Sequence, residues 1–331
     1  MKNNVIFVFI YCFFTISFAN ANEHKEMYKK AFEEQSQMIK SEKPIDFKRS
    51  VFITENVFHK NTLSYFNFCN RITNQGNQLK SFIKEKNLSN YKTGGNYAVF
   101  NYMMQPSSLN DNRVCSYDFD DFMGRKDWTK MFVTKLMDTK GGNCHSLPYY
   151  YKILCEEIGA KASLDLAPNH IYIKHIDEEG KWTNIELTNG GFPRDQWMIQ
   201  QMSISVEAIK NNVYMKPLTQ KESIAMTMFD LACGYDFQFG EDEFYFEIVE
   251  TALSYFPTCI PLLMCKSNYY GGLGQKEQKK TSPDPKKLKY YYDLQTAMLE
   301  KINPLGHKEM PPELYRKWVE SVEKEKQSQK N

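Results

Sequence analysis

The clearest pattern of apolar and polar positions lies in the middle of the chain. Apolar residues there recur first at helical spacing and then in short runs, which predicts one helix, an apolar segment and two strands over residues 146–158, 162–167, 170–176 and 181–187. Gly159 provides a left-handed end for the helix, and Asp177-Glu178-Glu179-Gly180 between the strands is typical of a hairpin. A helix followed by antiparallel strands indicates an α+β domain, not a parallel doubly wound sheet.

Helical patterns flank this unit on both sides. Before it, we expect helices over residues 23–43, 62–72, 78–85, 96–104 and 128–136. After it, we expect helices over residues 222–235, 243–256, 260–269, 290–302 and 312–325. Asn74-Gln75-Gly76 predicts a break within the N-terminal helices, and residues 271–289 predict a polar, lysine-rich linker between the C-terminal ones.

These patterns divide the chain into five parts. They are a leader, an N-terminal helical region, an α+β core, a second helical region and a linker with charged C-terminal helices, over residues 1–21, 22–95, 96–200, 201–270 and 271–331. In the fourth part, Leu231-Ala232-x-Gly234-Tyr235 followed by Ala252-x-x-x-Phe256-Pro257 is similar to about one and a half tetratricopeptide units. That resemblance implies stacked helix pairs that can bind an extended partner.

The first residues have the composition of a secretory signal peptide. Lys2 gives a positive start, residues 5–18 are almost wholly apolar, and Ala19-Asn20-Ala21 fits a small-x-small cleavage site. The apolar run is shorter than the roughly 20 residues that a membrane span needs, and an uncleaved anchor is the alternative. We therefore expect export to the periplasm or beyond, with cleavage after Ala21 and no membrane span in the mature chain.

The overall charge argues against a nucleic-acid partner. With 42 lysines and arginines against 40 aspartates and glutamates, the formal net charge is only +2, which gives no field for a polyanion or an anionic lipid surface. Eight cysteines include Cys12 in the leader; the remaining seven are an odd number without a disulfide framework, so at least one stays free or pairs between chains. The sequence has no C-x-x-C motif and no histidine near Cys259 or Cys265, so we expect no metal and no cofactor.

The candidate chemistry begins at Gly142-Asn143-Cys144, at the predicted start of the central helix. The unpaired N–H groups and the dipole of a helix N-terminus lower the pKa of a thiol and so favour the nucleophilic thiolate. Asn143 is a suitable helix cap, Gly141 and Gly142 allow a sharp turn with space for a substrate carbonyl, and nearby backbone N–H groups could hold an oxyanion. His145 projects elsewhere on the helix and is a weaker candidate base. A buried structural cysteine is the alternative for Cys144.

Two residues on the predicted strands complete the candidate site. His170 opens the first strand, where it could act as a rigidly held base or acid, while His175 points to the opposite, apolar side. If the loop between the strands has three residues, Tyr172 lies opposite Glu186, and His170 lies diagonal to Glu186 on the same face. A four-residue loop would turn the Glu186 carboxylate away. Asn184 shares that face and is the alternative partner, and an exposed strand glutamate is the structural alternative for Glu186.

In order and spacing, these residues resemble the transglutaminase-like branch of the papain-type cysteine hydrolases. That family places G-x-C-x-S at the start of a helix ending in L-G, then P-x-H on a strand and an acid on the next strand; this chain has Gly142-x-Cys144-x-Ser146, Ile158-Gly159, Pro168-x-His170 and Glu186. The resemblance covers roughly residues 98–197 and is strongest to the bacterial subgroup that couples this core to tetratricopeptide-like helices. It implies a helix packed on an antiparallel sheet and a triad of Cys144, His170 and Glu186, with glutamate in place of the usual aspartate.

Two functions follow from these observations. The first is an exported cysteine hydrolase or acyltransferase acting on an amide of a protein or peptide: Cys144 forms a thioester, His170 relays protons and Glu186 orients His170. The second is a non-catalytic scaffold that keeps this fold and binds a protein or peptide through the helices from residue 222 onward. A third hypothesis, a structural protein of the envelope, has only the leader in its favour.

Overall fold

The computed structural model describes residues 4–309 together with residues 311, 313, 316, 317, 320, 321 and 324, with the backbone alone for residues 4–20. Residues 1–3 of the predicted signal peptide, the side chains of its residues 4–20 and much of the predicted terminal helix over residues 312–325 therefore lie outside the description. Within the described part of the chain, no helix is both long enough and apolar enough to cross a membrane.

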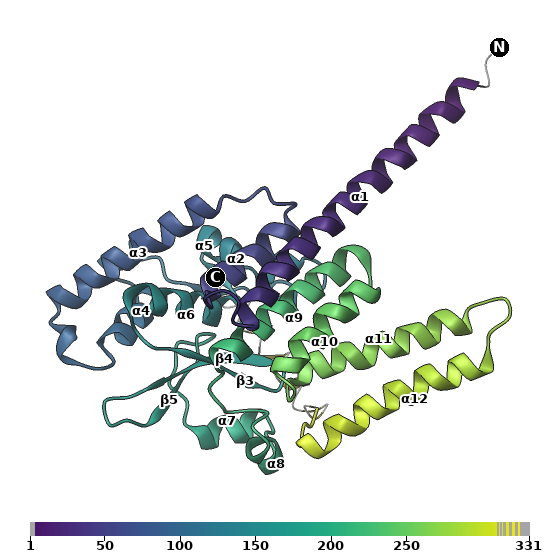
Figure 1. Ribbon diagram of the computed structural model, residues 1–331. Coiled ribbons are helices and arrows are strands. Elements are labelled where there is room, and N and C mark those ends of the chain that lie inside the picture. Colours follow the sequence, from purple (N-terminus) through teal and green to yellow (C-terminus); the bar gives the residue numbers. More distant parts are fainter. Residues whose placement is uncertain are drawn as a thin grey trace.

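Helices make up most of the described chain (Figure 1). Its N-terminal half contains the helices α1 (Asn4–Ile39), α2 (Phe47–Phe58), α3 (Tyr65–Glu85), α4 (Gly94–Met104), α5 (Val133–Thr139) and α6 (Ser146–Ile158). Its C-terminal half contains α7 (Asp195–Gln201), α8 (Val206–Lys210), α9 (Gln220–Phe239), α10 (Glu243–Tyr255), α11 (Ile260–Gln278) and α12 (Pro285–Ile302). Short 3-10 helices are η1 (Leu88–Asn90), η2 (Ser108–Asn110), η3 (Trp128–Met131) and η4 (Asn303–Leu305). The strands are β1 (Ser116–Tyr117), β2 (Gly141–Gly142), β3 (Ser163–Ala167), β4 (His170–Ile176) and β5 (Trp182–Ile185).

The larger sheet has the antiparallel strand order β3-β4-β5. In the hairpin between β4 and β5, the Asp177 N–H donates to the Lys181 carbonyl over 2.8 Å, and Gly180 has φ +83°. The loop therefore has three residues and ends on a left-handed glycine, as predicted. The register continues from that pair, so that Ile173 lies opposite Ile185.

β5 ends earlier than the predicted strand over residues 181–187. Instead of extending the sheet, Glu186 pairs with Gly191 in an isolated antiparallel bridge, with both N–H to C=O distances at 2.9 Å. The chain thus folds back immediately after β5. This turn holds Glu186 at the end of the sheet where β4 begins with His170.

α6 has the predicted bounds and packs against β3 and β4. It also contacts α3, α4 and α5, which explains why every residue from 146 to 155 is buried. Gly159 ends the helix with φ +80°, the left-handed conformation expected from the sequence. A helix packed on an antiparallel sheet confirms the α+β class at this level of description.

The predicted break at Asn74-Gln75-Gly76 is wrong, because α3 continues through it without interruption. α3 packs against α6. A Cβ atom at Gly76 would lie only 2.8 Å from Cγ of Glu157 on α6. Gly76 is therefore explained by the close approach of two helices and not by a turn.

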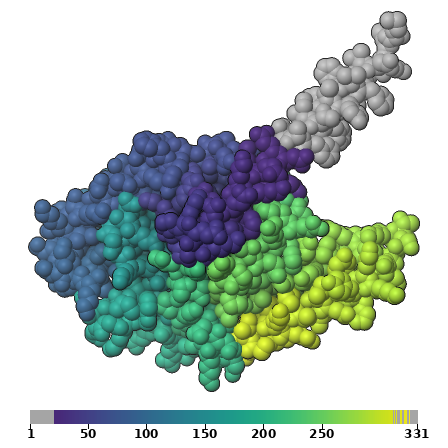
Figure 2. All heavy atoms as spheres, viewed as in Figure 1, coloured from purple at the N-terminus to yellow at the C-terminus, as the bar shows by residue number. Residues whose placement is uncertain are grey.

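The predicted linker over residues 271–289 is also wrong. α11 extends through its first part and α12 through its last, and the two helices form a hairpin at one end of the molecule (Figures 1 and 2). A Cβ atom at Gly271 would lie 2.5 Å from Nε2 of Gln295, and one at Gly274 would lie 2.9 Å from Cε1 of Tyr292. The glycines therefore let α11 and α12 pack closely, and they do not mark a flexible segment.

α9 joins the C-terminal helices to the rest of the molecule (Figure 1). It packs against α1, α2 and α10, so most of its surface is buried. Polar contacts reinforce this packing: Gln35 of α1 donates to the hydroxyl of Thr54 in α2 over 2.8 Å. The hydroxyls of Ser50 and Thr227, from α2 and α9, are 2.6 Å apart. In this position α9 directs the carboxylate of Asp230 toward the start of α6.

Candidate active site

Cys144 lies at the N-terminal tip of α6, and an asparagine cap holds it there. The side-chain oxygen of Asn143 accepts the N–H groups of His145 and Ser146, each over 3.0 Å. The Ser146 hydroxyl in turn accepts the Asn143 N–H over 3.1 Å. Asn143 therefore caps the helix as predicted, and Cys144 sits where the helix dipole favours a thiolate.

The two glycines before this cap do not make the predicted sharp turn. Gly141 and Gly142 are extended and pair in parallel with β1. A Cβ atom at Gly142 would lie 2.8 Å from Oγ of Ser146 and 3.0 Å from Cγ of Leu147. The space beside Gly142 is thus filled by the start of α6 and is not available to a substrate carbonyl.

Replacing Gly142 by alanine is expected to destabilise the protein by about 2 kcal/mol, because overpacking a well-packed site costs about 1–3 kcal/mol. Urea unfolding measures the effect. Gly141 is the matched control, since the nearest atoms to a Cβ there lie 3.6 Å away. G141A should change the free energy of unfolding by less than about 0.5 kcal/mol. Equal stabilities of G142A and G141A would contradict the packing of this cap.

The two strand residues of the candidate site contact each other directly. Nε2 of His170 lies 2.6 Å from Oε2 of Glu186, and both side chains are largely buried. Oε1 of Glu186 accepts the backbone N–H of Thr188 over 2.9 Å and its hydroxyl over 2.7 Å, which fixes the carboxylate. The diagonal contact expected from the register is therefore present. Asn184 donates instead to the Pro193 carbonyl over 2.9 Å and is not the partner of His170.

The other ring nitrogen of His170 is directed at Cys144. The imidazole lies close enough to the Cys144 side chain to interact with it, and this interaction lowers the pKa of the thiol and raises that of the imidazole. Since Glu186 engages Nε2, Nδ1 is the nitrogen that remains for the sulfur. Cys144 as a residue is partly exposed. The three residues singled out in the sequence thus lie in one connected group.

Charge interactions within this group outweigh the cost of burial. Burial disfavours the protonated imidazole, but the charge of Glu186 and the interaction in which the imidazole donates to the Cys144 sulfur raise the pKa of His170 to about 10. Burial likewise opposes ionisation of the thiol, yet His170, with a smaller contribution from His145, holds the pKa of Cys144 below its usual value. His170 also lowers the pKa of Glu186 against the effect of burial. The arrangement therefore favours a thiolate–imidazolium pair.

Tyr117 belongs to the site although no sequence pattern indicated it. It lies on β1 opposite Gly142, with its hydroxyl close enough to interact with the side chain and the backbone of Cys144. Burial raises the pKa of this phenol, so the hydroxyl keeps its proton and can donate. The N–H groups of His145 and Ser146 are engaged within the cap. The remaining donors beside the sulfur are therefore the Cys144 N–H and the Tyr117 hydroxyl, which interact with each other, and this set of donors is narrower than the sequence implied.

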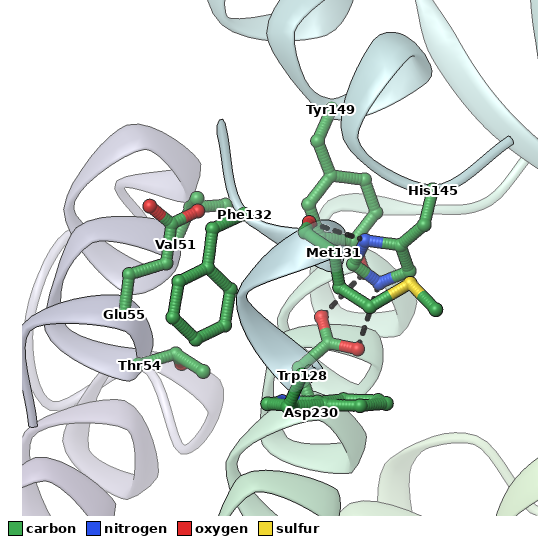
Figure 3. A pocket seen from close by; sticks show the side chains of 9 residues that line it. All are labelled: Val51, Thr54, Glu55, Trp128, Met131, Phe132, His145, Tyr149 and Asp230. Atoms are coloured by element: carbon green, nitrogen blue, oxygen red, sulfur yellow. Dashed lines mark hydrogen bonds and ion pairs between the residues drawn. The ribbon is translucent and has the colours of Figure 1, made fainter. Parts of the chain in front are cut away.

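The two weaker histidine candidates lie elsewhere. His175 is on the other face of β4, where its Nδ1 is 3.0 Å from the Ile176 carbonyl. His145 points toward α9, and its Nε2 lies 2.8 Å from Oδ1 of Asp230 (Figure 3). Asp230 is a second residue that sequence reasoning missed, because it is 85 positions away and carries no motif of its own.

Among the residues that the structure describes, no group of three or more His, Cys, Asp or Glu side chains is placed to hold a metal ion. No family model, curated protein or solved structure matches this chain. The chemistry of the site is accordingly inferred from the geometry of its own side chains.

Proposed function

We propose that this chain is an exported cysteine hydrolase or acyltransferase of the transglutaminase-like class, which acts on an amide of a protein or peptide through a thioester intermediate. The observation that carries the proposal is the connected path from the Cys144 thiol through His170 to Glu186. An imidazole that contacts a thiol with one nitrogen, and is held by a carboxylate at the other, activates that thiol as a nucleophile.

In the proposed reaction the Cys144 thiolate attacks the amide carbonyl carbon and forms a C–S bond. The carbonyl oxygen becomes an oxyanion, which the Cys144 N–H and the Tyr117 hydroxyl would stabilise. Protonated His170 gives its proton to the amide nitrogen, the C–N bond breaks, and the amine leaves a thioester behind. Water or a second amine then attacks the thioester, His170 takes up its proton, and the thiolate departs.

Glu186 has an orienting role in this scheme. By binding Nε2 of His170, it keeps Nδ1 directed at the sulfur and stabilises the imidazolium. The transglutaminase-like class usually has aspartate here. Because Glu186 reaches His170 over 2.6 Å, the additional methylene group does not prevent the contact.

The same contacts favour an enzyme over a non-catalytic scaffold. A scaffold that retained only the fold would not require a partly exposed cysteine joined to a buried ion pair. In the scaffold alternative, the helices α9 to α12 would bind a protein or peptide partner. The substrate of the proposed enzyme is likewise a protein or peptide. Export is proposed from residues 1–21 alone.

Alkylation of Cys144 by iodoacetamide at different pH values tests the proposal. An ordinary thiol, with a pKa near 8.5, should react roughly 80-fold more slowly at pH 6 than at pH 8. For Cys144 we expect a fall of less than about tenfold, since the neighbouring imidazolium keeps the sulfur ionised. Mass spectrometry of the Cys144 peptide gives the rate, and the peptide of the partly exposed Cys69 serves as the reference within the same sample. A Cys144 curve with the shape of an ordinary thiol would overturn the proposal.

A further inference from the structure

A buried network behind the thiol connects Cys144 to α9. Oδ1 of Asp230 lies 2.8 Å from Nε2 of His145, the residue next to Cys144, and Oδ2 accepts the Tyr149 hydroxyl over 2.9 Å (Figure 3). Nδ1 of His145 lies 3.1 Å from the Met131 carbonyl oxygen. All three side chains of this network, from His145, Tyr149 and Asp230, are buried.

The contacts of His145 define its protonation state. Its two ring nitrogens face a carboxylate oxygen and a carbonyl oxygen, and both are acceptors only. A neutral imidazole has a single N–H and would leave one of these contacts without a proton. Only the imidazolium satisfies both. The raised pKa of His145 agrees with this, since Asp230 outweighs the burial that disfavours the charge.

One other carboxylate interacts with this imidazole through its charge. Glu55 of α2 accepts the N–H groups of Val133 and Thr134 at the start of α5, over 2.6 and 2.9 Å. Burial raises the pKa of Glu55 to about 7. His145, Glu55 and Asp230 line a common cavity of about 10 Å³, which is the size needed for one water molecule. The titratable groups around His145 are therefore Asp230 from α9, Glu55 from α2, Tyr149 from its own helix, and Cys144.

We infer that Asp230 is a positioning residue for the Cys144 site: its carboxylate holds His145 as an imidazolium beside the thiol and so adds a second positive charge to that of His170. The inference rests on the proposed function, in which Cys144 acts as a thiolate. His145 contributes to the lowered pKa of Cys144, after His170. Through Asp230, the reactivity of the sulfur depends on a helix of the C-terminal region.

The test compares the iodoacetamide pH profile of Cys144 in the full-length protein with those of D230N and H145Q. Both variants remove the positive charge at position 145 and keep most of the hydrogen-bonding shape. We expect each to lower the alkylation rate at pH 6 by about three- to tenfold, corresponding to a rise in the pKa of Cys144 of up to about one unit. At pH 9 each rate should stay within about twofold of wild type, because the thiol is then ionised in all forms.

Three comparisons separate positioning from a general loss of structure. In the double variant D230N/H145Q, Cys144 should be alkylated at pH 6 no more slowly than in either single variant, since both substitutions act through the same imidazolium. D230E should recover at least half of the alkylation rate that D230N loses at pH 6. D236N, which removes an exposed carboxylate of the same helix, should match wild type. If D230N does not fold, H145Q and D230E carry the test.

The outcomes distinguish this inference from the proposed function. If the wild-type alkylation rate of Cys144 falls less than about tenfold from pH 8 to pH 6, and the D230N and H145Q profiles coincide with it, the role of Asp230 is overturned and the enzyme proposal stands. A wild-type profile like that of an ordinary thiol would overturn both. Equal losses at pH 6 and pH 9 in D230N and H145Q would assign Asp230 a purely structural role.

Discussion

Replacing Cys144 by alanine is expected to lower the rate of acyl-enzyme formation by at least about 1,000-fold, because no other group can take the place of the nucleophile. The reagent is p-nitrophenyl acetate, an activated ester that transfers its acetyl group to a reactive thiolate. Stopped-flow release of p-nitrophenolate gives the rate, and mass spectrometry of the acetylated peptides locates the acyl group.

Cys69 provides the matched control for this experiment. Like Cys144 it is a free, partly exposed cysteine, but it lies on α3. C69A should therefore acetylate at the wild-type rate, with the acetyl group on Cys144. Acetylation of C144A at the wild-type rate, or of Cys69 in preference to Cys144, would exclude Cys144 as the nucleophile.

Local chemistry explains which parts of the site could be predicted from the sequence. The three-residue loop ending at Gly180 sets the register of β4 and β5, and that register alone brings His170 diagonal to Glu186. Asn143 and Gly159 define the two ends of α6 through short-range hydrogen bonds and backbone conformation. Each of these signals acts over a few residues, so it can be seen without knowledge of the rest of the fold.

The errors arose where a residue serves a distant contact. The sequence predicts a break at Gly76 and a linker at Gly274, yet both residues lie within helices that pack closely on Glu157 and Tyr292. A glycine permits a turn and a close helix approach equally well, and only the tertiary neighbour decides between them. The prediction of sharp turning at the two glycines before Asn143 failed for the same reason.

The residues missed in the site have a similar explanation. Tyr117 reaches Cys144 because β1 pairs with β2, a contact between two strands of only two residues each. Asp230 reaches His145 because α9 packs against α2 and lies beside the start of α6. Neither residue has a neighbouring motif, and an aspartate in an amphipathic helix is usually interpreted as solvent-facing. Strand pairs this short and contacts this distant carry no periodic signal in the sequence.

Replacing His170 by asparagine is expected to reduce the alkylation rate of Cys144 at pH 6 by about 100-fold, which corresponds to a rise of about two units in the pKa of the thiol. The reason is that the imidazolium, which offsets the burial of the thiol, is lost, so the pKa of Cys144 rises. Because the pKa of His170 is about 10 in the folded protein, its charge is present throughout the neutral range and disappears as the pH rises through that value. The difference in alkylation rate between H170N and wild type should therefore be largest at low pH and should disappear near pH 10.

His175 provides the matched control for this prediction. It lies on β4 as His170 does, but on the opposite face, where its ring contacts only a backbone carbonyl among the hydrogen bonds of the described residues. In H175N, Cys144 should therefore be alkylated within about twofold of the wild-type rate at every pH. H170N, which removes the imidazole on the other face, should lower the rate at low pH. If both variants lowered the rate equally at every pH, the loss would come from a weakened sheet. A selective effect of H170N that grows as the pH falls requires an ionised sulfur next to a protonated ring.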